Sequence, residues 1–218
     1  MLADLDNTIL DFDSAERGAL RAAFRRLGIP FRHGTLERYR AINTRLWTAY
    51  SRGEIAGAQV AIQRFEELLA ELEYRLPARR LARAYLAALR LRGDTLPGAR
   101  RALVLLRRRF RVAVVTNGYT RVQKSRLRRA GLLAHVDALV TSESAGHAKP
   151  DPRIVHSALR LLGVSRHEAI LVGDDLRTDQ GAATAARMPF YWIDSGDRGA
   201  GRRPRLRVRS LLELAERL

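Results

Sequence analysis

Cysteine is absent from this chain of 218 residues. Disulfide bonds and thiolate metal sites are therefore excluded as sources of stability. No apolar run approaches the roughly 18 residues that a membrane-spanning helix needs, and no signal peptide is visible. With 46% hydrophobic residues, the chain has the composition of a globular protein rather than of a disordered one. We therefore expect a soluble, cytoplasmic protein without a membrane partner.

Lysine is almost absent as well, because Lys124 and Lys149 are the only two lysines. Arginine supplies the rest of the 40 basic residues, which outnumber 23 acidic ones and give a net charge of +17. Such a balance is typical of nucleic-acid-binding proteins, which remain an alternative from a different functional class. The arginines are spread over several helical patterns and form no single stripe. We therefore interpret them as solvated helix faces and do not expect a nucleic-acid partner.

The hydrophobic pattern predicts an α/β fold. Four short segments rich in valine and isoleucine indicate buried strands, at 112–117, 136–141, 169–175 and 190–194. Helical patterns separate them, and this alternation is typical of a parallel, Rossmann-like sheet. Residues 14–91 show helical spacing throughout and no convincing strand. We therefore expect an α/β core of residues 1–13 and 92–218, with an all-helical domain inserted at 14–91.

Polar residues follow the predicted strands at the points where they end. In open parallel sheets, ligands bind at the carboxyl ends of the strands, so these residues are expected to meet at one edge. Carboxylates are hard oxygen ligands of the kind that Mg²⁺ accepts, and hydroxyl and ammonium groups donate hydrogen bonds to phosphate. A carboxylate can also attack phosphorus to form an aspartyl-phosphate. The residues concerned are Asp4, Asp6, Thr116, Asn117, Asp174 and Asp175, with Lys149 in a following loop.

Four of these segments carry a resemblance to a known family. "DLDNT", "VVTNG", "AKPDP" and "VGDDLRTD" occur in the order and spacing of the haloacid dehalogenase-like hydrolase superfamily. The helical block resembles the C1-type cap domain of that superfamily. Two segments, "GEIAGAQVAIQRFEELL" and the stretch around "VVTNG", resemble one branch of that superfamily, which contains pyrimidine and non-standard 5′-nucleotidases. The resemblance covers essentially the whole chain.

The resemblance implies a Mg²⁺-dependent phosphomonoester hydrolase. Asp4 would be the nucleophile, and Asp6 would protonate the leaving oxygen and then deprotonate the attacking water. The Asp4 carboxylate, the Asp6 main-chain carbonyl and Asp174 would bind the metal. Asp179, or else Asp175, would support the metal from behind these ligands.

The phosphoryl group would be held by residues from two other motifs. Thr116 and the main-chain amides of Asn117 and Gly118 would bind its oxygens, and Lys149 would neutralise their charge. A retained lysine in an arginine-rich chain agrees with a site that needs a compact ammonium. Three positions thus contribute hydrogen bonds and one contributes charge.

Small phosphorylated metabolites are the expected substrates, with nucleoside 5′-monophosphates first among them. Sugar phosphates, phosphoglycolate and a phosphosugar mutase reaction remain open alternatives. A dehalogenase would lack the acid at Asp6. A phosphonoacetaldehyde hydrolase would need a lysine in the helical block, and residues 14–91 contain none. Either a monomer or a homodimer is compatible with the sequence.

Overall fold

The computed structural model describes residues 1–194 and 204–218. The chain divides into two compact units, one formed by Met1–Phe12 with Gly93–Leu218 and the other by Asp13–Arg92. Within the described ranges, no helix is both long and apolar enough to cross a membrane.

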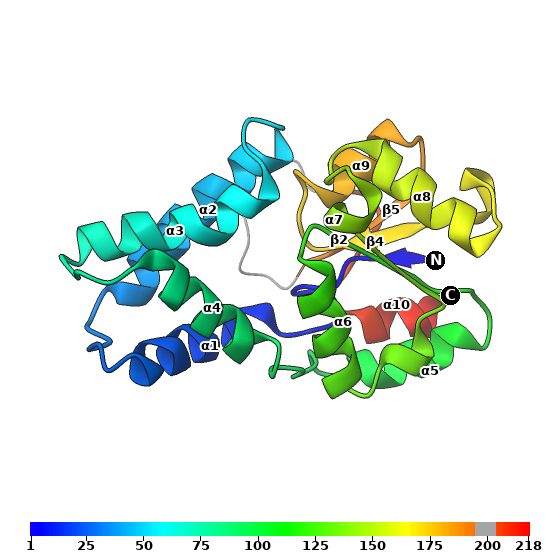
Figure 1. The fold of residues 1–218 in the computed structure, drawn as a ribbon. Coiled ribbons are helices and arrows are strands. Elements are labelled where there is room, and N and C mark those ends of the chain that lie inside the picture. Colours follow the sequence, from blue (N-terminus) through cyan, green and yellow to red (C-terminus); the bar gives the residue numbers. More distant parts are fainter. Residues whose placement is uncertain (195–203) are drawn as a thin grey trace. The chain divides into compact units, whose positions relative to one another are not determined.

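The first unit contains a parallel sheet of six strands in the order β3-β2-β1-β4-β5-β6 (Figure 1). All five strand pairings are parallel, and β1 lies between β2 and β4. This arrangement confirms the predicted α/β, Rossmann-like fold. The strands are β1 (Leu2–Ala3), β2 (Ala113–Thr116), β3 (Ala138–Thr141), β4 (Leu171–Gly173), β5 (Phe190–Ile193) and β6 (Arg207–Val208).

Helices cover both faces of this sheet, with α5 (Ala99–Arg107) and α10 (Leu211–Arg217) on one face and α8 (Pro152–Leu162) and α9 (Asp179–Ala185) on the other (Figure 1). Alternate strand residues point to opposite faces. Ala3, Val114 and Val172 therefore join the core beneath α5 and α10. Their neighbours along the strands, including Leu2 and Leu171, join the core beneath α8 and α9. Burial on both faces explains why these strands are continuously apolar.

Two further helices of the first unit begin just after the carboxyl ends of strands. α6 (Thr120–Arg129) follows β2, and the short α7 (Ser142–Ala145) follows β3. Each of the four predicted segments is longer than its strand, because residues at one or both of its ends lie outside the ladder. β1 has only two residues, but both are fully buried and pair on each side.

The second unit is entirely helical. Its helices are α1 (Phe12–Arg26), whose first residue belongs to the first unit, α2 (Thr35–Ser51), α3 (Gly57–Glu71) and α4 (Ala78–Leu89). Its interior holds three packed rings, those of Tyr39, Phe65 and Tyr85, with centroids 5.3–5.6 Å apart. The buried Arg64 guanidinium lies over these rings and donates to Asn43 Oδ1 at 3.0 Å. These three aromatic residues thus belong to the buried core of the helical unit.

Candidate active site

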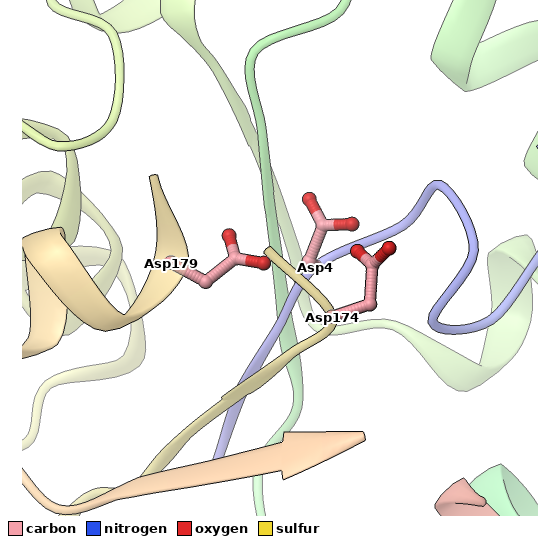
Figure 2. Close-up of side chains that lie close together, drawn as sticks. All are labelled: Asp4, Asp174 and Asp179. Atoms are coloured by element: carbon pink, nitrogen blue, oxygen red, sulfur yellow. The ribbon is translucent and has the colours of Figure 1, made fainter. Parts of the chain in front are cut away.

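Three carboxylates meet at the carboxyl edge of the sheet. Asp4 follows β1, Asp174 follows β4, and Asp179 begins α9. One oxygen of each lies within 4.8 Å of one oxygen of the others. Figure 2 shows the side chains of Asp4 and Asp174 projecting to the same side, each from its own segment. Among the described residues, this acidic cluster is the group suited to hold a metal ion.

Lys149 is buried beside this cluster, with only 3% of its surface exposed. Its Nζ atom donates to Asp4 Oδ1 at 2.5 Å and to Asp179 Oδ1 at 2.6 Å. A third hydrogen bond, of 2.8 Å, goes to the main-chain oxygen of Val115. The three donors of the ammonium are therefore all used by groups from three separate segments.

The electrostatics of the acidic cluster favour an added cation. Burial raises the pKa of Asp4 well above its usual range and also raises that of Asp179, although Lys149 opposes both shifts. Burial alone lowers the pKa of Lys149, but Asp179 and Asp4 outweigh it and raise the pKa overall. One ammonium cannot balance three neighbouring carboxylates, which repel one another. A divalent cation would supply the missing charge, and carboxylate oxygens are the ligands that Mg²⁺ prefers. The residues therefore fit this ion.

Gly173 allows Asp179 to reach the cluster. A Cβ atom at position 173 would lie only 2.8 Å from Asp179 Cβ, and it would overlap the carboxyl group still more closely. If the Asp179 side chain rotated away, it would lose two hydrogen bonds. Its Oδ1 accepts from Lys149, and its Oδ2 accepts from the Asp175 amide at 3.1 Å. Glycine is therefore required at the end of β4.

Thr116 ends β2, and Asn117 follows it beside Lys149. The Thr116 hydroxyl oxygen accepts from the Gly118 amide at 3.2 Å. The Asn117 side chain binds the main chain of Lys149 at both ends, because its Oδ1 accepts from Lys149 N and its Nδ2 donates to Lys149 O, at 2.8 and 2.9 Å. Asn117 thus holds the loop that carries the lysine, a role of its side chain that the sequence did not indicate.

Asp6 lies apart from the acidic cluster and faces α6. Its Oδ2 accepts from Gln123 Nε2 at 2.7 Å, and its Oδ1 accepts from Arg126 Nη1. Gln123 Nε2 also donates to Thr116 Oγ1 at 3.1 Å, so it connects Asp6 to the end of β2. Sequence reasoning missed Gln123 and Arg126. The structure places both in the buried stripe of α6 with Val122 and Leu127, where apolar residues are expected.

Asp175 has a local role. Its Oδ1 accepts from the Arg177 and Thr178 amides at 2.7 and 3.1 Å, and these bonds shape the turn into α9. Of the two residues proposed to support the metal ligands, Asp179 lies in the acidic cluster and Asp175 contributes its main-chain amide.

A sequence model of haloacid dehalogenase-like hydrolases matches residues 1–187. The chain belongs to this family. The membership predicted from the four motif segments is thereby confirmed, and the haloacid dehalogenase-like hydrolase described here is an enzyme.

This haloacid dehalogenase-like hydrolase has nucleotidases among its relatives. It is 32% identical over 218 residues to pyrimidine 5′-nucleotidase YjjG of Escherichia coli K12, with 99% of this chain and 95% of that protein covered. It is 29% identical over 196 residues to pyrimidine 5′-nucleotidase PynA of Streptococcus pneumoniae R6, with coverage of 89% and 83%. The crystal structure of HAD-hydrolase YfnB from Bacillus subtilis, bound to magnesium, matches with a TM-score of 0.91 and 30% identity, with coverage of 99% and 96%.

Proposed function

We propose that this hydrolase is a Mg²⁺-dependent phosphomonoesterase that acts through an aspartyl-phosphate on Asp4. The observation that carries the proposal is the placement of Lys149 Nζ, 2.5 Å from Asp4 Oδ1 and beside the acidic cluster. A nucleophilic carboxylate, an adjacent ammonium and a set of hard oxygen ligands are the parts that phosphoryl transfer requires.

In the first half-reaction, an Asp4 carboxylate oxygen attacks phosphorus as the bond to the leaving oxygen breaks. Lys149 orients the attacking carboxylate and offsets the negative charge of the phosphoryl oxygens. The Thr116 hydroxyl, at the buried end of β2, donates to one of these oxygens. Asp6 supplies the proton that the leaving alkoxide needs. The product of this step is the alcohol and a phosphorylated Asp4.

In the second half-reaction, water attacks the phosphorus of the aspartyl-phosphate. Asp6, now a carboxylate, accepts a proton from the water, and the bond between phosphorus and the Asp4 oxygen breaks. Inorganic phosphate leaves and the Asp4 carboxylate is restored. Asp6 therefore acts once as an acid and once as a base.

Mg²⁺ would be held by the carboxylates of Asp4 and Asp174 and the main-chain carbonyl of Asp6, and it would neutralise charge on the phosphoryl group. Asp179 would hold Lys149 in place and add negative charge behind the metal ligands. Because both of its oxygens already accept hydrogen bonds, we assign it this supporting role.

Nucleoside 5′-monophosphates are the substrates that we propose. The support is the similarity to YjjG and PynA, both named pyrimidine 5′-nucleotidases, over most of each chain. The excess of basic residues, with a net charge of +17, also favours anionic small molecules over neutral ones. We further propose that Asp13–Arg92 is a cap domain and that the enzyme works in the cytoplasm.

The test is a steady-state screen of the purified enzyme against nucleoside monophosphates, sugar phosphates and phosphoglycolate. We expect Mg²⁺-dependent release of phosphate, highest with the nucleotides, and none from Asp4→Asn, because an amide is a poor nucleophile. Full activity in excess EDTA after the metal has been stripped would contradict the metal dependence. Near-normal turnover by Asp4→Asn would show that the nucleophile is another residue.

A further inference from the structure

Helix α6 buries two polar side chains that the proposed mechanism does not yet use. Gln123 is 2% exposed and Arg126 is fully buried. Removing an amide or a guanidinium from water is costly unless hydrogen bonds replace the lost hydration. The flanking Val122 and Leu127 are buried on the same stripe of the helix. The helix thus places polar groups at two positions where apolar side chains would pack at lower cost.

These two side chains converge on Asp6. Gln123 Nε2 donates to Asp6 Oδ2 at 2.7 Å, while Arg126 Nη1 donates to Asp6 Oδ1. Arg126 Nη1 also donates to Gln123 Oε1 at 3.1 Å, which fixes the orientation of the Gln123 amide. Both oxygens of the Asp6 carboxyl group therefore accept hydrogen bonds from α6.

The pair is itself held by its surroundings. The Arg126 guanidinium lies over the Phe12 ring, 5.6 Å from its centroid. Gln123 packs against the turn after β2, where a Cβ atom at Gly118 would lie 2.7 Å from Gln123 Cδ. Gln123 Nε2 donates a second hydrogen bond, of 3.1 Å, to Thr116 Oγ1. A single amide group thus connects the Asp6 carboxyl to the Thr116 hydroxyl.

We propose that Gln123 and Arg126 are positioning residues that hold Asp6 at a fixed place relative to the phosphoryl-binding Thr116. This inference rests on the proposed phosphatase function and assigns to it two residues outside the family motifs quoted above. Neither residue needs to touch the substrate. Each acts through Asp6, whose carboxyl must lie within hydrogen-bond reach of the leaving oxygen and later of the attacking water.

Misplacing Asp6 has an effect that depends on the leaving group. When the bond between phosphorus and an alkyl oxygen breaks, the alkoxide must take a proton from Asp6. A p-nitrophenolate anion is stable and leaves without that proton. Both esters form the same aspartyl-phosphate, and its hydrolysis needs Asp6 as the base. Loss of position should therefore slow the first step for alkyl esters alone and the second step for both.

The experiment compares kcat/KM for p-nitrophenyl phosphate with kcat/KM for the best alkyl phosphate of the wild-type enzyme. Gln123→Met removes all three hydrogen bonds of the amide at similar volume. Arg126→Lys keeps the charge but loses the planar fork. We expect the ratio of alkyl to aryl kcat/KM to fall about 10- to 100-fold in each variant, within the range that general acid catalysis supplies. Acid-quenched samples with the aryl ester should contain more phosphoenzyme than the wild type.

Matched controls lie on the same helix. Lys124→Met and Arg128→Lys change exposed neighbours and should leave the ratio at its wild-type value. Thermal melting shows which variants fold. If Arg126→Lys does not fold, Gln123→Met alone tests the positioning role. Equal losses on both esters, or an unchanged ratio in folded Gln123→Met, would overturn the positioning role. A wild-type enzyme that hydrolyses neither ester would instead overturn the proposed function, and this inference would fall with it.

Discussion

The ammonium of Lys149 lies between the carboxylates of Asp4 and Asp179, 2.5 and 2.6 Å from their Oδ1 atoms, although Asp4 is 145 positions away along the chain. Its third hydrogen bond goes to a main-chain oxygen of β2. An ammonium suits this position because it is compact and its three donors can point in three directions, whereas a guanidinium is planar and wider.

Lys149→Arg should therefore reduce activity strongly, even though it preserves the charge. We expect kcat/KM to fall by about 10²–10³, the scale for loss of one preorganised electrostatic partner. Lys124→Arg is the matched control, because Lys124 is exposed on α6 and should tolerate the change. Wild-type efficiency in folded Lys149→Arg would show that Lys149 is not the electrostatic partner of the phosphoryl group.

Metal binding should be visible without any substrate. Three neighbouring carboxylates with one ammonium leave uncompensated negative charge, so a cation that binds only the folded chain should stabilise it. At a Mg²⁺ concentration of 100 times Kd, the gain would be about 2.7 kcal/mol. Differential scanning calorimetry with Mg²⁺ and with EDTA measures it. Asp174→Asn should abolish most of the shift, and a shift of wild-type size in that variant would place the metal elsewhere.

Gly173→Ala should disturb the site without replacing a charged residue. The added Cβ would lie 2.8 Å from Asp179 Cβ, in a region where Asp179 is held by Lys149 and by the Asp175 amide. We expect a loss of about 1–3 kcal/mol in the free energy of unfolding, which is typical of overpacking. Phosphatase activity should fall with the displaced Asp179. Urea unfolding and kcat/KM would be measured together, and wild-type values for both would contradict this account.

Asp151 gives a pH-dependent contribution to stability at the start of α8. Its Oδ1 accepts from the Arg153 amide at 2.9 Å, and the Arg153 side chain is the main reason that the pKa of Asp151 is lowered to about 2. Because this value lies below that of an unfolded chain, about 3.9, the stabilisation is present above that pH. It is lost as the pH falls through about 2.

Asp151→Asn keeps a capping oxygen but removes the charge. We expect it to destabilise the protein by less than about 1 kcal/mol at pH 7, since solvent screens the exposed ion pair with Arg153. The difference from wild type should shrink as the pH falls from 4 towards 2. Asp151→Ala, which also loses the cap, should cost about 1 kcal/mol more. Chemical unfolding at several pH values measures these differences, and a gap that widens in acid would contradict the assignment.

The α/β fold was predictable because its signals are local. Segments such as Ala113–Thr116 are buried at every residue and apolar at all but the last, as is typical of strands covered on both faces, and helical patterns alternate with them. The edge at which Asp4, Asp174 and Lys149 meet was also predictable, because parallel strands bring their carboxyl ends together. β6 and α10 were not predicted. Arg207 and Val208 form too short an apolar signal to mark a strand.

The partners of Asp6 could not be predicted in the same way. Gln123 and Arg126 lie in a helix dominated by basic residues, so in sequence they look like further members of its solvated face. What sets them apart is the rotation of the helix against the sheet, which depends on packing between distant segments. Asp179 illustrates the same limit, because its approach to Lys149 depends on the missing side chain of Gly173.

The side chain of Asn117 binds the main-chain nitrogen and oxygen of Lys149, while the lysine ammonium binds groups after β1, in β2 and in α9. Four stretches of the chain are thus tied together through one residue. For protein engineering, this means that the four stretches form a single transplantable part. A scaffold could receive the aspartates and the lysine without Asn117. It would then have the correct functional groups, but no side chain would fix the position of the loop that carries the lysine.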